Sequence, residues 1–497
     1  MSATTQQGVH TTPGTPAAGD FADWLSPMIV KELRQGLRTR TFTGLFMLIQ
    51  VVMVILTFVS LSAIEVQSAV RGFFWFTLVL AVVALIPLKG LQAINSEASD
   101  NTLDLLVLTR LQALRIVAGK WAALVAQAFL AVIAVLPYVF IHYFFGGVNL
   151  LHEVFNLMLL LFVSGVLSAI TVCFSAGRGK LARKGFAVFG FLLVGYMLFQ
   201  GLAIMMMSMG GGRAPAMMLF DIRALLRALP FVLTYGSFLI YLFLEIGAGR
   251  LAPEACNHST RRRLVSLGVV VVLLGLILCG VSPTEVWARL LAVTALIIVI
   301  DAFTDLPSTM RSLLLPFHLR RMVPVSYLLA PGWHTGALFS LLFLGAFALV
   351  LPEFGANRNS QLAFFFAVSS IVVMPAALVA TFFRRRGKPF RDYLLVHVVS
   401  LCVASVLGLL SGVTNEEGYI VLGCILTPHA TPFLEDVLSS SENFWVSLAG
   451  GWHLALAYFL LLWSSRSLFA EMRRTNREIV DQRREPSAGQ TLPGAEQ

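Results

Sequence analysis

The chain has 497 residues, of which 57% are hydrophobic and only 12% are charged, against about 25% charged residues in a typical soluble domain. With a mean hydropathy of +0.82, it cannot bury its apolar surface in a soluble core, and we expect an all-α, polytopic transmembrane helix bundle. The net charge of +10 is the excess of Lys and Arg expected on the cytoplasmic side of such a protein, so we do not expect a nucleic-acid partner.

The N-terminal region contains two different segments. Residues 1–20 are rich in Thr, Gly, Ala, Pro and Gln and lack an apolar core, which predicts a disordered tail and not a cleaved signal peptide. Residues 26–40 predict a short amphipathic helix, with Ser26 as N-cap and Pro27 in the first turn. Its apolar residues recur on one side and its basic residues on the other: Ile29, Leu33 and Leu37, then Lys31, Arg34 and Arg38. Such a helix lies in the membrane plane with its basic side toward lipid phosphates; an ordinary basic flank of the first span is the alternative.

Twelve apolar runs have about the 20 residues that cross a bilayer. They are residues 43–63, 73–92, 121–145, 153–176, 185–209, 229–248, 264–281, 286–303, 333–352, 361–383, 392–412 and 444–469. A weaker apolar stretch, Gly418–Phe433, is too short to span and contains two prolines. We interpret it as a re-entrant or interfacial segment.

The charges of the loops test this order of spans. With a cytoplasmic N-terminus, the inner segments contain 30 of the 36 Lys and Arg residues and the outer segments contain 6. The excess alternates loop by loop, as the positive-inside rule requires. The pattern predicts about twelve spans with both termini in the cytoplasm.

The polar stretch between the second and third spans is the most informative segment. Glu97, Asp100 and Asp104 place three acids on a face otherwise dominated by basic loops. Leu103 and Leu106 follow at helical spacing, which predicts a short helix with an acidic start and an exposed apolar edge. Lipid, another part of the chain or a cytoplasmic subunit could cover that edge.

These two segments resemble those of the permease subunits of type-2 ABC exporters. The family pattern is an amphipathic KEL.Q..R.R helix before the first span and an E…TLELL..TP…..I..GK segment between the second and third spans. The matching residues are Lys31, Glu32, Leu33, Gln35, Arg38 and Arg40, followed by Glu97, Thr102, Leu103, Asp104, Leu105, Leu106, Thr109, Ile116, Gly119 and Lys120. Arg110 and Asn101 differ from the Pro and Gly of the pattern. The resemblance covers roughly residues 24–250, which would form a six-span permease-like domain over residues 21–250.

The resemblance implies an interfacial elbow helix at about 26–40 and a coupling segment at about 95–120 that docks on an ATP-hydrolysing subunit. The implied elbow residues are Lys31, Glu32, Leu33, Arg34, Leu37 and Arg38. The implied ATPase-coupling residues are Glu97, Asp100, Thr102, Leu103, Asp104, Leu106 and Lys120. Because the chain has no GxxxxGK[ST] phosphate loop, we expect a transporter and not an enzyme, with a separate ABC ATPase subunit as partner. Membrane lipids are the other expected partners, and a homodimer or a second permease subunit are both open.

The second half, residues 251–470, predicts six more spans. Its longest inner loop, 304–332, again lies between its second and third spans, and its longest outer loop, 413–443, again precedes its last span. This spacing favours a degenerate parallel 6+6 repeat, although 304–332 is basic and proline-broken and lacks the acidic Thr-Leu-Asp pattern. Residues 471–497 predict a cytoplasmic tail.

No other chemistry is indicated by the sequence. The five cysteines are scattered and the histidines have no metal-ligand spacing, so we expect no cofactor and no metal. Glu65, Glu245 and Asp301 lie near span ends, where we expect them to snorkel toward water. That scarcity of buried charge argues against the main alternative, a twelve-span secondary transporter, and a non-transporting membrane scaffold is the third alternative. We expect the bacterial cytoplasmic (inner) membrane as the location.

Overall fold

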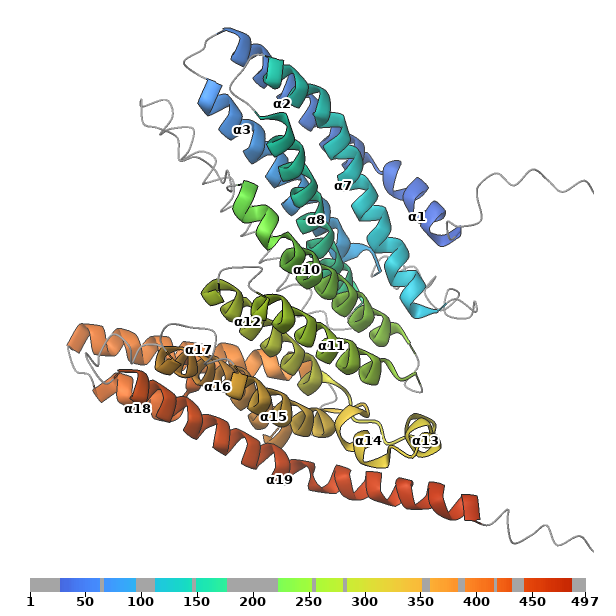
Figure 1. Cartoon of the computed structure of the whole chain (residues 1–497), viewed down its shortest axis with the longest axis vertical. Coiled ribbons are helices and arrows are strands. Elements are labelled where there is room, and N and C mark those ends of the chain that lie inside the picture. Colours follow the sequence, from blue (N-terminus) through green and yellow to red (C-terminus); the bar gives the residue numbers. More distant parts are fainter. Residues whose placement is uncertain are drawn as a thin grey trace, which may run out of the picture.

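The computed structural model describes residues 27–62, 67–94, 112–144, 149–176, 222–252, 256–279, 284–350, 358–382, 389–414, 418–430 and 442–484. All regular secondary structure in these ranges is helical, as the composition predicts. The helices form two bundles, which meet where α10 packs on α11 (Figure 1). The six coupling residues from Glu97 to Leu106 lie outside the described residues, as does the predicted disordered tail at 1–20.

The first bundle corresponds to the permease-like part of the sequence. Its helices are α1 (Pro27–Leu37), α2 (Arg40–Ser62), α3 (Gln67–Val79), α4 (Ile86–Lys89), α7 (Ala113–Phe144), α8 (Leu150–Ser175) and α10 (Ile222–Leu251). The second bundle contains α11 (His258–Leu278), α12 (Thr284–Thr304), α13 (Arg311–Leu319), α14 (Val323–Leu329), α15 (Trp333–Val350), α16 (Arg358–Phe382), α17 (Pro389–Thr414), α18 (Gly418–Leu426) and α19 (Glu442–Arg484).

Eight helices in the described part of the chain are long and apolar enough to cross a membrane, which makes this an integral membrane protein. They are Arg40–Ser60, Val70–Gln92, Ala113–Phe144, Leu150–Ser175, Leu229–Leu251, Leu362–Phe382, Arg391–Ser411 and Val446–Gln482. Each coincides with one of the twelve predicted runs. A ninth results if α14 and α15, which are bent by 93° at their junction, are counted together. The predicted run at 185–209 lies outside the described residues.

One predicted span is short in the structure. The apolar part of α11, from Leu264 to Leu278, has about 15 residues and is about 22 Å long at 1.5 Å per residue. A bilayer core is about 30 Å thick. The predicted run at 286–303 corresponds to α12, Thr284–Thr304. The count of twelve spans therefore remains a prediction.

The second span contains a π-helical turn, Leu80–Leu85, just before Pro87. Proline has no N–H, and its ring would clash with the carbonyl group four residues earlier in a regular α-helix. The wider π turn relieves that clash. Ser164 of α8 donates its hydroxyl to the Val82 carbonyl at 2.6 Å, which gives a partner to a backbone group at the irregular turn.

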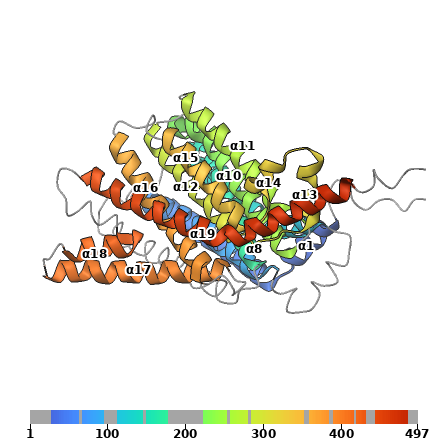
Figure 2. The ribbon, with the colours of Figure 1, turned by 90° about the horizontal axis from the view of Figure 1, so that it is seen from below.

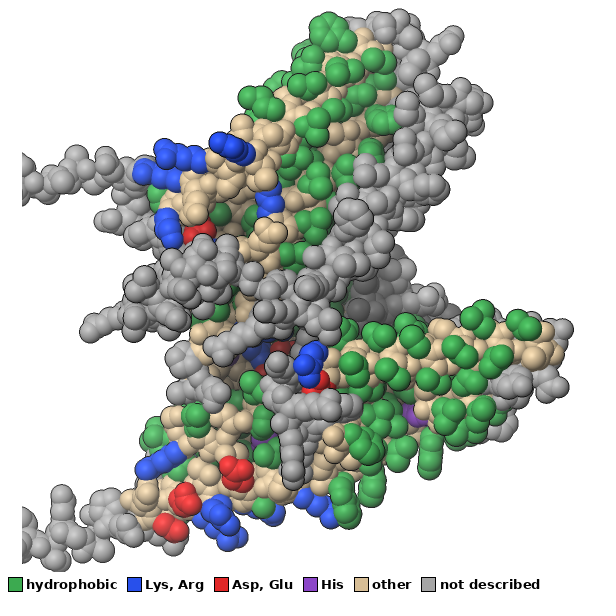
Figure 3. Space-filling model, turned by 180° about the vertical axis from the view of Figure 1, so that it is seen from behind, with side chains coloured by type: hydrophobic (Ala, Val, Ile, Leu, Met, Phe, Trp, Pro, Cys, Tyr) green, Lys and Arg blue, Asp and Glu red, His purple; other side chains and the backbone are tan. Residues whose placement is uncertain are grey.

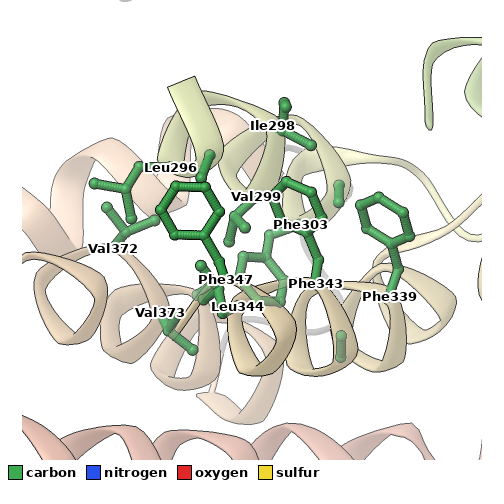
Figure 4. Packing of buried hydrophobic residues seen from close by; sticks show 14 of the residues in the cluster. Leu296, Ile298, Val299, Phe303, Phe339, Phe343, Leu344, Phe347, Val372 and Val373 are labelled. Carbon is green, nitrogen blue, oxygen red and sulfur yellow. The ribbon is translucent and has the colours of Figure 1, made fainter. Parts of the chain in front are cut away.

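The two bundles have separate apolar cores, and α10 contributes to both sides of their junction. Leu244 and Ala248 of α10 pack with residues of α7 and α8, whereas Phe231, Phe238 and Leu242 belong to the core of the second bundle. In that core, phenylalanine rings of α15 fill the space between α15 and α12 (Figure 4). A large apolar surface shared with α10 thus holds the bundles together.

The most extensive helix–helix contact in the second bundle is that of α16 with α19. A Cβ atom added to Gly450 of α19 would lie 2.7 Å from the backbone carbonyl carbon of Phe366 on α16. Only glycine allows backbones to approach this closely, as in small-residue contacts between membrane helices. The last helix is therefore fixed firmly to the bundle.

Both bundles have their basic ends on the same side of the molecule. The start of α1 and the end of α19 lie toward that side, which we call the inner end (Figures 1 and 2). The outer ends of the two bundles diverge, because the helices of the first bundle are inclined to those of the second. On the face shown in Figure 3, most Lys and Arg side chains gather toward the inner end and hydrophobic side chains cover the two diverging arms. This arrangement agrees with the positive-inside pattern of the sequence.

The predicted tail at 471–497 differs from the structure, because α19 continues as a helix to Arg484. Met472 and Ile479 are buried and form a small core with Leu314 of α13 and Ala330. Asn476 lies between Met472 and Ile479 along α19, and its Oδ1 is 2.9 Å from His318 Nε2. Residues 472, 476 and 479 share one helix face, which is why the polar segment stays helical and docks on α13.

Candidate functional site

The elbow helix predicted at about 26–40 is α1, Pro27–Leu37. Lys31, Arg34 and Arg38 are exposed, and Leu33 and Leu37 are partly buried. The helix therefore has the amphipathic character that its sequence predicts. Because α1 packs on α7, its apolar side is covered at least in part by the chain itself.

One buried ion pair joins the elbow helix to the helix that follows the predicted coupling segment. Lys120 Nζ of α7 lies 3.2 Å from Glu32 Oε2 of α1. The two side chains are 4% and 11% exposed, so water screens their attraction weakly. Lys120, which the resemblance assigns to ATPase coupling, thus points to α1.

A second lysine connects the start of the same segment to α7 and α2. Lys89, at the end of α4, donates from Nζ to Gln127 Oε1 of α7 at 3.4 Å, and its Nζ lies 5.1 Å from the centre of the Phe42 ring. Gln127 also lies close to α1, because a Cβ atom added to Gly36 would be 2.5 Å from its Nε2. The residues before and after the 95–111 segment are therefore both linked to helices α1, α2 and α7.

The structure brings together Glu32 and Lys120 among the predicted site residues. It gives no contact for Glu97, Asp100, Thr102, Leu103, Asp104 or Leu106, which lie outside the described residues. Sequence analysis missed Lys89 and Gln127. The sequence contained one indication of the ion pair. Lys120 lies among apolar residues, where a charged group needs a counter-charge, and Glu32 is the acid of α1.

A shallow groove runs along the exposed side of α1. It is lined by Val30, Lys31, Arg34, Gln35, Arg38 and Thr39. Three of these residues are cationic, and such a surface attracts phosphate groups of anionic lipids when it lies at a membrane interface. The groove thus suits the membrane-plane orientation that the sequence predicts for this helix.

A second charged cluster lies at the inner end of the junction between the bundles. Arg262 of α11 donates from Nε to Asp301 Oδ2 at 2.9 Å and from Nη2 to Asp305. His258 Nδ1 is 2.9 Å from Glu245 Oε1 of α10. These contacts join α10, α11 and α12, and therefore connect the two bundles through buried charges.

Arg263 hydrogen-bonds the backbone at the break between α14 and α15. Its side chain is 2% exposed and donates to the carbonyl groups of Leu328, Ala330 and Gly332 at 2.7, 2.8 and 3.0 Å. It also lies 3.2 Å from Asp305 Oδ2. A helix break leaves carbonyl groups without intrahelical partners, and the guanidinium group supplies the missing donors.

These contacts correct the expectation that Glu245 and Asp301 snorkel. Glu245 is 1% exposed, and Asp301 is bonded by a buried arginine. The physical reason is that the basic start of α11 lies beside the inner ends of α10 and α12 and brings counter-charges to them. Glu65, the third acid of that group, lies outside the described residues.

No protein-family model, no curated protein and no solved structure matches this chain. Within the described ranges, no group of three or more His, Cys, Asp or Glu side chains is placed to hold a metal ion. Function therefore has to be inferred from the arrangement of the residues themselves.

Proposed function

We propose that this chain is the permease subunit of an ABC exporter of the bacterial cytoplasmic (inner) membrane. A separate ABC ATPase subunit would hydrolyse ATP, and the chain would move a substrate, for which an amphipathic molecule is the default, across the bilayer. The main support is the buried Glu32–Lys120 pair, which connects the two segments that carry the family resemblance. The pair brings into contact two segments that lie 88 residues apart in sequence.

In the proposed mechanism, closure of the ATPase subunits displaces the 95–120 segment. Lys120 transmits the displacement to α1 through Glu32, because separating the two side chains costs an attraction that water screens only weakly. Lys89 transmits it to α7 through Gln127. The π-helical turn above Lys89 is a point at which the second span can bend. Together these movements would tilt the first bundle and open a path outward or into the lipid.

The docking step is tested with an ATPase encoded beside this gene. Leu103→Asp, which places a charge on the apolar edge of the coupling segment, and Glu97→Ala should both reduce co-purification of that subunit. Unchanged co-purification and unchanged stimulated ATP hydrolysis in both variants would count heavily against the proposal.

The transmission step has its own variants and control. Lys120→Met and Glu32→Gln should keep the complex and lower transport-coupled ATP hydrolysis by about tenfold, which corresponds to about 1.4 kcal/mol of coupling free energy. The charge-swapped double variant, Glu32→Lys with Lys120→Glu, should recover part of the loss. Arg38→Gln is the matched control, since Arg38 is an exposed cation directly after the same helix. Equal losses in Arg38→Gln and Lys120→Met would show that the buried pair has no special role.

The buried acids Glu245, Asp301 and Asp305 favour a second candidate, an ion-coupled secondary transporter, because acids within membrane bundles often bind coupling ions. Two outcomes separate the candidates. Transport by the purified chain alone, driven by an ion gradient and abolished by an ionophore, would identify a carrier. Transport that requires the ATPase subunit and ATP would identify an ABC permease.

A further inference from the structure

The weak apolar stretch Gly418–Phe433 begins with α18, a short helix that lies alongside α17 at the margin of the second bundle (Figure 2). Residues Thr427–Ala430 follow it, and Ala430 is buried with Cys424 against Ala404 of α17. His429 reaches His397, which lies six residues after the start of the span Arg391–Ser411. The described residues Gly418 to Ala430 therefore run back along α17 and form a helical hairpin with it.

Histidines hold this hairpin in place. His429 contacts two residues of α17. Its Nε2 lies 3.0 Å from His397 Nδ1, and its Nδ1 lies 2.9 Å from Ser400 Oγ. From the other side, His453 Nε2 of α19 lies 2.6 Å from the Cys424 carbonyl oxygen. Since a carbonyl group can only accept, His453 carries its proton on Nε2.

The His397–His429 contact contains one shared proton when both rings are neutral. In one arrangement His397 Nδ1–H donates to His429 Nε2, and His429 Nδ1–H donates to Ser400. In the other, His429 Nε2–H donates to His397, and the Ser400 hydroxyl donates to His429 Nδ1. One added proton leaves the contact intact, because an imidazolium still donates to the neutral ring and donates more strongly. A second added proton removes the last acceptor and places two cations 3.0 Å apart.

Few charged groups face the pair from the elements packed on it. On α17, Asp392 is ion-paired with Arg391, and the Tyr393 ring meets His397 edge-on with ring centres 4.6 Å apart. On α18 the titratable group is Cys424, on α19 it is His453, and on α12 Asp301 is bonded by Arg262. The described part of α16 beside them has no Asp, Glu, Lys, Arg or His from residue 362 to 382. Asp392 and Asp301 are thus already paired with arginines, and neither is free to act as counter-charge for a doubly protonated pair.

We propose that His397 and His429 form a proton-sensitive latch between α17 and α18. With no more than one added proton the two rings bond and keep α18 against α17. With two added protons they repel each other, and α18 leaves its position beside α17. The proposal concerns the second bundle alone and does not depend on the proposed ABC function.

The hairpin position is measured by double electron–electron resonance between spin labels on two exposed residues, Ile425 on α18 and Leu349 on α15. The labels are placed in the full chain, in nanodiscs, after replacement of the five native cysteines. Spectra are compared near neutral pH and at about pH 3, because a second proton added beside an existing cation requires a pH well below the ordinary histidine pKa of about 6.5. We expect a defined distance at neutral pH and loss of that distance at acidic pH.

Three variants decide the interpretation. His397→Gln keeps a group that can donate to or accept from His429 but does not titrate, so the distance should persist at both pH values. His397→Ala removes the bond and should lose the distance at both, if it folds. His318→Gln, a histidine on α13 at the inner end, is the matched control and should respond to pH as the unmodified chain does. An unchanged distance at acidic pH in the unmodified chain, or an unchanged pH response in His397→Gln, overturns the proposal.

Discussion

The inner ends of the two bundles are closed in different ways. In the first bundle, the residues on either side of 95–111 make polar contacts through two long side chains: Lys89 contacts α2 and α7, and Lys120 of α7 contacts α1. In the second bundle, α13 and α14 lie at the corresponding place, where Arg263 bonds them on one side and the end of α19 covers them on the other. We call the contacts of Lys89 and Lys120 the tether, and the contacts around α13 and α14 the seam.

This difference bears on where a partner subunit can bind. The proposed ATPase site belongs to the first bundle, where the resemblance lies. In the second bundle the chain itself covers α13, and docking of a second subunit there would require α19 to leave a buried apolar contact. The sequence of 304–332, which lacks the acidic Thr-Leu-Asp pattern, agrees with this assignment.

The largest loss of stability is expected from removing the Arg263 contacts of the seam. Arg263→Ala removes the donors of the Leu328, Ala330 and Gly332 carbonyl groups and leaves Asp305 with one arginine. Loss of one partner of a buried pair costs about 3–5 kcal/mol, and each orphaned carbonyl adds to it. We expect little or no folded protein by size-exclusion chromatography in detergent.

The neighbouring Arg261 provides the control for this variant. Its side chain is 58% exposed and its Nη1 is 3.9 Å from Glu245. Arg261→Ala should therefore change the free energy of unfolding by about 1 kcal/mol or less. If both arginine variants fold equally well, the seam does not depend on Arg263.

The next effect comes from uncovering α13. Ile479 is 0% exposed in the contact between α19 and α13, and Ile479→Asp should destabilise this contact by about 3–4 kcal/mol because it buries a charge in place of an apolar side chain. We expect limited proteolysis to cut within residues 305–332 much faster than in the unmodified chain. Val480→Asp, at a neighbouring residue that is 37% exposed, is the matched control. Equal cleavage of the two variants would show that α19 does not protect α13.

Much of the fold could be predicted from the sequence, because apolar runs of fixed length and the distribution of charge follow directly from the physics of the bilayer. Eight predicted spans and the amphipathic α1 correspond to helices of the structure. The docked end of α19 was also present in the sequence, as Met472 and Ile479 on one helix face. It was missed because high average polarity concealed a sparse apolar stripe.

The pairing of charges could not be predicted in the same way. Arg262 and Arg263 fit the positive-inside rule as well as exposed arginines do, although both are buried. The rule records which side of the membrane a residue is on and contains no information about its partner. Likewise, Glu32 and Lys120 are 88 residues apart, and their contact depends on how α1 packs on α7. Tertiary packing decides such pairs, and local sequence does not encode it.

The smallest effects on stability are expected from two glycine-to-alanine substitutions, one at Gly332 in the seam and one at Gly36 beside the tether. Gly332 has φ +127°, and a Cβ atom there would lie 2.7 Å from the His334 ring and 3.1 Å from the Pro307 Cα atom. Gly332→Ala should lower stability by about 1–3 kcal/mol, because it adds backbone strain to a clash with backbone atoms.

The corresponding change in the first bundle meets a movable neighbour. A Cβ atom at Gly36 would contact only the end of the flexible Gln127 side chain, at 2.5 Å, and alanine gains up to about 1 kcal/mol over glycine in a helix interior. We therefore expect Gly36→Ala to change the melting temperature in detergent little, and Gly332→Ala to lower it clearly. Gly345, where a Cβ atom would meet nothing within 4 Å, supplies the control for alanine in an open helix position. If Gly36→Ala proves as damaging as Gly332→Ala, the tether is as rigid as the seam, and the contrast between the two inner ends is wrong.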